Sequence, residues 1–281
     1  WGFLAKAQEV LEELPFRDII SWNALMSGYV QQGQGHEALK CFEWILRESE
    51  NMQNECLSPN VVTFVCILKA CGMTKDIQKG EEMHEELLNK GWLVKDVMLG
   101  NALVDMYAKC GMLLKAQHVL EEIPLKNTVT WNAIIGGYAE KGQYQEAVHC
   151  FERMEGEGLL VNEVTFICIL KACGNIGALG KGQQIHSKLA SKGLLKEDIV
   201  LGNALIDMYV KCGALSRAQN VLNNIPVRNI ISWSALIAGY TQQAESHEAL
   251  NCFEKMRNEG FTPNAITLSC ILKACGNTGA I

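Results

Sequence analysis

The sequence has 281 residues, 48% of them hydrophobic and 20% charged, with a formal net charge of −6 at pH 7. It has only five prolines and no apolar run of roughly eighteen residues, so neither a membrane span nor a disordered tail is supported. An acidic balance is also atypical of proteins that hold nucleic acid mainly through a basic surface. Because the chain opens at Trp1, we interpret it as an excerpt of a longer protein.

An internal repeat organises the chain. The stretch Gly100–Gly111, GNALVDMYAKCG, returns as Gly202–Gly213, GNALIDMYVKCG, with two conservative exchanges. The same offset of 102 residues relates Cys71 to Cys173 and then to Cys275. A match of this length indicates a duplicated unit, and a fixed period is the signature of a repeat architecture.

Each period divides into three repeats of 35, 36 and 31 residues. The complete repeats span 61–96, 97–127, 128–162, 163–198, 199–229 and 230–264, preceded by 19–60, which has an insertion near Ser49–Glu55. Partial repeats at 1–18 and 265–281 complete the chain. We interpret the insertion as an enlarged connection, which repeat arrays tolerate.

Each repeat predicts two helices joined by a tight turn. In 97–127, apolar residues recur at helical spacing up to Gly111, and a second apolar stripe begins at Leu114. A glycine suits this break because a chain leaving a helix favours a left-handed residue there, and it recurs at Gly33, Gly111, Gly142 and Gly213. Such hairpins bury their apolar stripes only by stacking on their neighbours, so we predict an all-α superhelical α-solenoid of tandem helix-turn-helix hairpins.

Three other recurring slots are predicted to lie in the core. The second helices keep an alanine for close packing at Ala38, Ala116, Ala147, Ala218 and Ala249, and the larger core residues are Trp22, Trp131, Trp233, Phe42, Phe151 and Phe253. The twelve cysteines also recur at fixed slots without C-x-x-C spacing. We expect them to be small buried thiols, and neither disulfides nor metal ligands.

Two further slots carry polar side chains. The fifth residue of the 35- and 31-residue repeats is Asn23, Asn101, Asn132, Asn203 or Ser234, and the last residue of the same repeats is Asn60, Asn127, Asn162, Asn229 or Asn264. A protein that reads one base per repeat needs such side chains on a shared helix face, because an amide both donates and accepts hydrogen bonds. The alternative is that the fifth Asn caps its own helix in the first turn.

The repeats resemble the pentatricopeptide repeat family, through stretches such as SWNALMSGY (Ser21–Tyr29), TFICILKACG (Thr165–Gly174) and NALVDMYAKCG (Asn101–Gly111). The alternation of 35, 36 and 31 residues is similar to the plant PLS subclass, with P, L and S motifs in that order. The resemblance implies a right-handed superhelix that binds single-stranded RNA in chloroplasts or mitochondria. In editing factors, a deaminase-like domain C-terminal to such an array converts cytidine to uridine.

The resemblance also implies a role for particular residues. In the family, the fifth and last residues form the base-selecting pair, and the second residue sandwiches the base. Carried over, Asn23 with Asn60, Asn101 with Asn127, Asn132 with Asn162 and Asn203 with Asn229 favour a pyrimidine, and Ser234 with Asn264 favours adenine. The 36-residue repeats pair Val65 with Asp96 and Ile167 with Asp198, so they select weakly. The sandwiching residues are Ile20, Val62, Met98, Val129, Val164, Val200 and Ile231.

These assignments predict a preference for 5′-Y-N-Y-Y-N-Y-A-3′, where Y is a pyrimidine and N any base. The candidate phosphate contacts are Lys69 and Lys171, four residues beyond the fifth slot, and Lys109 and Lys211, eight beyond it. Both spacings lie within about 80° of the reading face of a helix. The alternative is that these lysines are ordinary solvated side chains.

No set of residues predicts catalysis in this chain, because every candidate recurs as a structural slot. We expect no enzyme activity, cofactor, metal, membrane or small-molecule substrate for this segment, and single-stranded RNA as partner, with other proteins of an editing complex. The alternative function is a scaffold that binds a peptide or helix in the concave groove, as helical solenoids also do.

Overall fold

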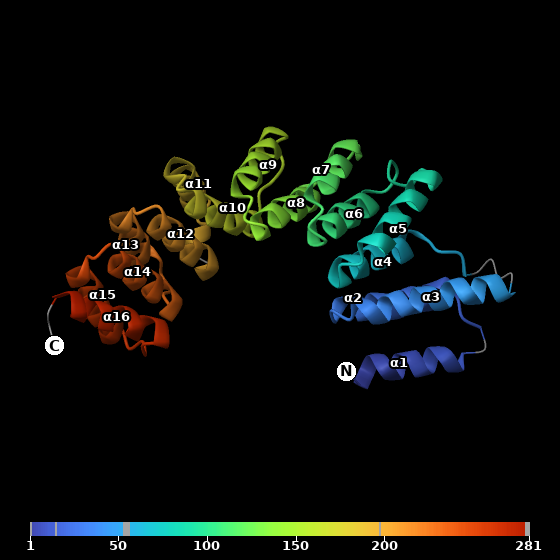
Figure 1. Cartoon of the computed structure of the whole chain (residues 1–281), viewed down its shortest axis with the longest axis horizontal. Helices are drawn as coiled ribbons and strands as arrows, with labels where there is room; N and C mark the ends of the chain where they lie inside the picture. Colours follow the sequence, from blue (N-terminus) through green and yellow to red (C-terminus); the bar gives the residue numbers. More distant parts are fainter. Residues whose placement is uncertain (1, 15, 53–56, 197, 279–281) are drawn as a thin grey trace. The chain divides into compact units, whose positions relative to one another are not determined.

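The computed structural model describes residues 2–14, 16–52, 57–196 and 198–278 (Figure 1). Within them every regular element is helical, which confirms the predicted all-α class. The α-helices are α1 (Gly2–Glu13), α2 (Ile19–Gln31), α3 (Gly35–Met52), α4 (Val61–Thr74), α5 (Ile77–Lys90), α6 (Val97–Lys109), α7 (Leu113–Glu122), α8 (Thr128–Glu140), α9 (Tyr144–Gly156), α10 (Glu163–Ile176), α11 (Leu179–Ser191), α12 (Ile199–Lys211), α13 (Leu215–Asn224), α14 (Ile230–Gln242), α15 (Ser246–Asn258) and α16 (Ala265–Thr278), with a short 3₁₀ turn η2 (Leu194–Lys196).

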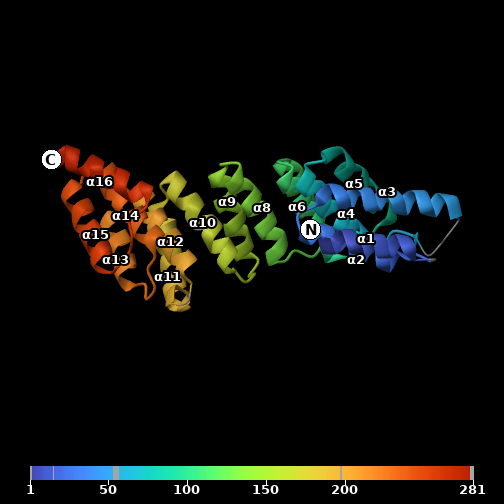
Figure 2. The same cartoon turned by 90° about the horizontal axis from the view of Figure 1, so that it is seen from below.

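Two compact units make up the chain, Trp1–Lys141 and Gly142–Ile281. In the first unit, α2 pairs with α3, α4 with α5 and α6 with α7, and the first helices of successive hairpins pack in the order α2, α4, α6, α8. In the second unit, α10, α12, α14 and α16 pack in the same sequential way (Figure 2). Each unit is therefore a stack of helical hairpins, as predicted for an α-solenoid.

Each predicted repeat begins where a helix begins, for a local reason. The last residue of the preceding repeat is the N-cap, and its side-chain oxygen accepts from a backbone N–H in the first turn: Asp18, Asn60, Asp96, Asn127, Asn162, Asp198, Asn229 and Asn264. Such caps contribute about 1 kcal/mol each. They account for the helix starts, whereas the assignment of the repeats to three motif types stays a prediction.

The turn between the two helices of a hairpin uses a left-handed residue. The predicted glycines have positive φ, for example 79° at Gly111 and 74° at Gly213. In the third copy of the 35-residue repeat the slot holds Ala244, with a φ of 60°. An alanine is strained in this conformation because its Cβ approaches the carbonyl oxygen that follows it.

The predicted core slots are buried. The three tryptophans are at most 2% exposed, Phe42 and Phe151 are equally buried, and all five recurring alanines are fully buried, while Phe253 is only half-buried. Full burial of one large apolar side chain stabilises the fold by roughly 2–3 kcal/mol. Among the described cysteines, burial raises the pKa of the Cys41 and Cys71 thiols to about 12, so these two stay protonated and inert at neutral pH.

The insertion in the first copy differs from the expected connection. α3 has 18 residues, whereas the corresponding helices α9 and α15 have 13 each, so Ser49–Met52 lengthens the helix. The rest of the insertion, 53–55, lies outside the described residues. Among the described helices, none is both long and apolar enough to cross a bilayer.

Candidate nucleic-acid interface

The second residue of each repeat is a large apolar side chain that solvent reaches. These side chains are between 45% and 71% exposed, although each lies in the first turn of a helix that buries most of its large apolar residues: Ile20, Val62, Met98, Val129, Val164, Val200 and Ile231. Packing within the chain does not explain one exposed β-branched or sulfur-containing side chain per repeat. Such a recurring apolar surface is typical of an interaction site.

The fifth residues lie in the second helical turn, one turn beyond the cap. Asn23 and Ser234 are each 6% exposed, while Asn101, Asn132 and Asn203 are half-buried. None of them caps its own helix, because the residue before the helix does so. The capping alternative for the fifth residue is therefore wrong, and capping belongs to the last residue of the preceding repeat.

The fifth and last residues of one repeat meet in both units. In the first unit, Asn23 Nδ2 donates to Asn60 Oδ1 at 3.0 Å. In the second, Asn203 Nδ2 lies 3.4 Å from Asn229 Oδ1, and the Ser234 hydroxyl lies 2.8 Å from that of Thr267. Asn23 and Asn203 thus lie close to the last residues of their repeats, whereas Ser234 contacts the third residue of the next repeat. The pairing of Asn101 with Asn127 and of Ser234 with Asn264 stays a prediction. Asn132 and Asn162 belong to different units, so their pairing stays a prediction.

Capping fixes how the last residue presents its amide. Asn127 Oδ1 accepts from the N–H groups of Val129 and Thr130, at 2.9 and 3.0 Å. Only the oxygen can accept these bonds, so the Nδ2 group must face the other way. Among the described residues, Asn127 Nδ2 makes no hydrogen bond. A ligand in the groove therefore meets N–H donors at this slot.

The 36-residue repeats lack this polar arrangement. Val65 is 7% exposed and Ile167 is half-buried. Their last residues, Asp96 and Asp198, each cap the next helix through one carboxylate oxygen, with bonds of 2.7 Å to the second N–H of the helix. Their fifth residues are apolar and offer no hydrogen bond to a ligand.

The four candidate lysines divide into two classes. All four are exposed. Lys109 forms an ion pair with Asp105 at 2.7 Å, and Lys211 forms one with Asp207 at 2.9 Å, each across one helical turn. Lys69 and Lys171, in contrast, have no ion-pair partner in the described part of the chain. The ammonium groups of Lys69 and Lys171 are therefore more available to a ligand than those of Lys109 and Lys211.

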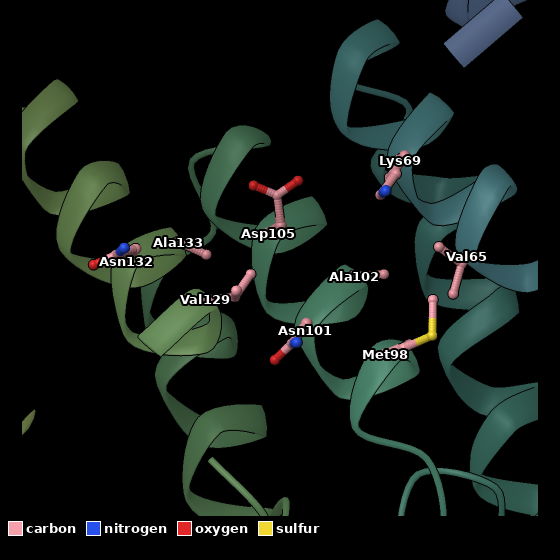
Figure 3. A pocket seen from close by; sticks show the side chains of 9 residues that line it. All are labelled: Val65, Lys69, Met98, Asn101, Ala102, Asp105, Val129, Asn132 and Ala133. Atoms are coloured by element: carbon pink, nitrogen blue, oxygen red, sulfur yellow. The ribbon is translucent and has the colours of Figure 1, made fainter. Parts of the chain in front are cut away.

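A hollow of about 430 Å³ in the first unit brings several of these slots together (Figure 3). It lies between α4, α6 and α8, and Figure 3 shows Asn101 with Met98 on one side and Val129 on the other. The lining combines second, fifth and candidate phosphate-binding residues: Val65, Lys69, Met98, Asn101, Ala102, Asp105, Val129, Asn132 and Ala133. Lys109 is not part of the lining, although its partner Asp105 is.

Two histidines at the same slot of successive 36-residue repeats make a structural contact. No group of three or more His, Cys, Asp or Glu side chains among them has the geometry to hold a metal ion. His84 and His186 instead bond through Nδ1 to the hydroxyl groups of Tyr107 and Tyr209, both at 2.9 Å. Each contact joins the second helix of one hairpin to the first helix of the next, α5 to α6 and α11 to α12.

The stacked hairpins, with an exposed apolar second residue in each complete repeat and a polar fifth residue in the 35- and 31-residue repeats, define a helical-repeat protein. Profiles of the PPR repeat family match residues 17–73, 126–175 and 228–277, and a PPR repeat profile matches 62–92, 101–127 and 203–230. These matches cover more than half of the chain. The chain therefore belongs to the pentatricopeptide repeat family.

Curated relatives from Arabidopsis thaliana match along the whole chain. It is 35% identical over 280 residues to the pentatricopeptide repeat-containing protein At4g18520, chloroplastic, and 34% identical over 281 residues to At2g03380, mitochondrial. The matches cover all of this chain, but only 44% and 40% of the two relatives. The chain thus spans less than half the length of the relatives it matches.

Among solved structures, the fold is similar to the pentatricopeptide repeat protein PPR10, crystallised in complex with an 18-nt psaJ RNA element. The TM-score is 0.79 at 19% identity, over 98% of this chain and 41% of the other. At this identity the likeness shows the fold alone. It supports the α-solenoid assignment.

Proposed function

We propose that this chain binds single-stranded RNA, one base per repeat, in the groove formed by the second, fifth and last residues of its repeats. The observation that carries the proposal is the hollow of about 430 Å³ in which the fifth residue Asn101 lies beside the second residues Met98 and Val129, with Lys69 on the rim. Apolar faces suit the flat surfaces of a base, amides suit its edge, and a lysine suits the phosphate.

The amide orientation supports a pyrimidine preference at the Asn/Asn repeats. Capping uses the oxygen of the last residue, so that this slot presents N–H donors. Both pyrimidines have the O2 acceptor on the edge that lies opposite these donors. A shorter Ser at the fifth slot leaves more room in the 234/264 repeat, which favours the larger adenine. The proposed preference is 5′-Y-N-Y-Y-N-Y-A-3′.

The proposal extends to the type of protein. The 35-, 36- and 31-residue alternation supports the P, L and S assignment, and the chloroplastic and mitochondrial relatives support an organellar location. We infer that the chain is the recognition array of an organellar RNA-editing or RNA-processing factor. Chemistry on the RNA, including any deaminase-like step, then belongs to a domain C-terminal to this segment or to partner proteins of an editing complex.

A reciprocal exchange tests the proposal within one unit. Asn203→Ser converts the sixth reading position to the Ser/Asn combination that Ser234 and Asn264 already have, and Ser234→Asn does the reverse at the seventh. Binding to randomised single-stranded RNA is expected to shift toward adenine at the sixth position in the first variant. In the second variant it shifts toward pyrimidine at the seventh position.

The controls are duplex RNA of the same sequence and a single-stranded RNA of reversed polarity. Duplex RNA is expected to bind less tightly than the matched strand, because its bases are paired and stacked and do not enter the groove. The reversed strand is expected to bind less tightly because adenine then meets the first repeat and a pyrimidine the seventh. Equal binding to all three, or unchanged base preference in both variants, would refute the proposal. Loss of all RNA binding by the unmodified chain would favour the peptide-scaffold alternative instead.

A further inference from the structure

The third residue of a repeat contacts the reading residues of the repeat before it. Thr63 Oγ1 lies 2.8 Å from Asn23 Oδ1, on the neighbouring helix α2. The hydroxyl groups of Thr130 and Ser232 bond in the same way to the side-chain oxygens of Asn101 and Asn203. A hydroxyl from the next repeat therefore touches the fifth residue in each of these three cases.

The hydrogen-bond donors and acceptors fix the direction of these bonds. The Asn60 backbone N–H donates to Thr63 Oγ1 at 3.1 Å, so the hydroxyl must turn its single proton elsewhere. Its two acceptors are Asn23 Oδ1 at 2.8 Å and Asn60 Oδ1 at 3.2 Å, and the shorter bond goes to Asn23. Thr63 is fully buried and Asn23 is 6% exposed, so water does not readily replace this bond.

The consequence is a fixed orientation of the fifth amide. With its oxygen held by the hydroxyl, Asn23 turns Nδ2 toward Asn60, to which it donates at 3.0 Å. The last residue is already oriented by the cap, so bonds within the chain set the directions of both amides. Without the hydroxyl, the fifth amide can rotate by half a turn and offer its oxygen, which reverses the pattern of donors and acceptors that a base meets.

The pattern along the sequence agrees with this contact. Whenever the fifth residue of a repeat is polar, the third residue of the next repeat has a hydroxyl group. These third residues are Thr63, Thr130, Thr165, Ser232 and Thr267. Where the fifth residue is Val65 or Ile167, the third residue of the next repeat is a leucine, Leu99 or Leu201 respectively. The two slots thus change together from polar to apolar, although they lie more than a helix apart in the sequence.

Helix capping alone does not explain the hydroxyl. In three cases it completes a capping box with the last residue, at Asn60, Asn127 and Asn229. However, α6 and α12 are capped by Asp96 and Asp198 with a leucine at the third slot. A helix in this array can therefore begin without a hydroxyl at the third position. A capping box also does not explain why the hydroxyl bonds to the fifth residue of the preceding repeat.

We propose that a Thr or Ser at the third position of a repeat is a positioning residue for base selection by the repeat before it, because its hydroxyl holds the fifth-residue Asn with the amide nitrogen toward the base. This inference rests on the proposed function and adds a further position to the residues that set specificity. It assigns Thr130 to the third base of the RNA, read by Asn101, and Ser232 to the sixth, read by Asn203.

The first test removes one hydroxyl while keeping its shape. Thr130→Val is compared with Thr130→Ser against four RNAs that differ only at the third base. Thr130→Val is expected to lose most of the pyrimidine-over-purine preference at this base and to keep the preferences at the sixth and seventh. Thr130→Ser, which retains the hydroxyl, keeps the preference. A folding defect would lower binding to all four RNAs equally, so the ratio separates positioning from stability.

The second test introduces the amide and its hydroxyl partner into a repeat that has neither. Val65→Asn alone places an amide without a hydroxyl partner, and the Val65→Asn/Leu99→Thr double variant supplies both. Only the double variant is expected to gain a pyrimidine preference at the second base. An equal gain in the single variant would overturn the inference, and so would an unchanged third-base preference in Thr130→Val. If the unmodified chain itself shows no third-base preference, the proposed function fails instead.

Discussion

Lys109 Nζ lies 2.7 Å from an Asp105 carboxylate oxygen, one turn earlier on α6. Lys69, on the neighbouring helix α4, has no such partner among the described residues and lines the hollow that Asp105 also lines. The local charge at Lys109 is therefore largely neutralised before any RNA arrives. Of the two lysines, we therefore propose Lys69 as the better candidate for a phosphate contact.

Removing the charge of Lys69 or of Lys109 should affect RNA binding to different extents. Lys69→Gln is expected to weaken RNA binding equally for all sequences and to reduce the slope of log affinity against log salt by about 0.7, the value for one phosphate contact on a single strand. Lys109→Gln should change the slope less, whereas Asp105→Asn should raise affinity. Salt titrations of the three variants check this, and a larger slope change at Lys109 than at Lys69 would contradict it.

The last residue of a repeat caps the next helix and, in our proposal, contacts a base, and two substitutions can distinguish these roles. Asn229→Ala is expected to destabilise the protein by about 1 kcal/mol in denaturant unfolding, because α14 loses its cap. Asn229→Asp keeps the cap, as Asp198 does for α12, but replaces the outward N–H donors by an acceptor oxygen. Its stability should stay close to that of the unmodified chain.

The RNA preference of Asn229→Asp should change at the sixth base only. An acceptor there favours uracil, whose N3 carries a hydrogen, over cytosine, whose N3 is itself an acceptor. Competition between RNAs with cytosine or uracil at this base measures the shift. A stable variant with an unchanged ratio of the two would show that the last residue caps the helix without reading the base.

Local patterns in the sequence were enough to predict the hairpins and the start of each. The period of 102 residues indicated a repeat architecture, whereas the base-sandwiching role of a second residue such as Val129 was predicted only from the family resemblance. The capping role was misplaced, although Asn60 and Thr63 have the three-residue spacing of a capping box. The Asp105–Lys109 pair also has an i, i+4 signal that the sequence shows.

Other parts of the site needed the three-dimensional arrangement. Thr130 and Asn101 are 29 residues apart, and only the packing of α8 against α6 brings their side chains together. Contacts between neighbouring repeats depend on the packing of helices, which the pattern within one repeat does not specify.

The exposed second residues should contribute to RNA affinity without contributing to stability. Val129 is 61% exposed, so Val129→Ser is expected to change the free energy of unfolding by less than about 0.5 kcal/mol. Its RNA affinity should fall, because the variant loses the apolar face that we propose lies beside a base. Leu114→Ser is the matched control, since Leu114 is 82% exposed on α7, outside the lining of the hollow. Equal RNA affinities of the two variants would argue against a stacking role.

Ala244 offers a stabilising substitution. Its φ of 60° lies in the left-handed region, where Gly33 has a φ of 73° in the corresponding turn of the first copy. Ala244→Gly relieves a strain of about 1–2 kcal/mol, offset in part by the greater freedom of glycine in the unfolded chain. A net stabilisation of roughly 0.5–1 kcal/mol is expected from urea unfolding. Gly33→Ala is the reverse control and should destabilise by a similar amount.

Two half-buried histidines predict that stability falls in mild acid. Burial is the main cause that lowers the pKa of His84 and His186 below the ordinary 6.5, and both contact a tyrosine hydroxyl. Near His84, Glu122 and Glu85 oppose the shift, whereas His118 and Lys115 add to it. A depressed folded-state pKa means that the unfolded chain binds more protons between that value and 6.5. The stabilisation is therefore complete above pH 6.5 and declines as the pH falls toward the folded-state pKa.

A variant without these two imidazoles isolates their share of the pH dependence. His84→Gln/His186→Gln keeps polar side chains beside Tyr107 and Tyr209 but cannot titrate. Urea unfolding midpoints of both proteins, measured from pH 7.5 to pH 5, should fall more steeply for the unmodified chain. Carboxylates titrate in both proteins, so the difference between the two curves reports the histidines. Parallel curves would mean that His84 and His186 titrate alike in the folded and unfolded chains.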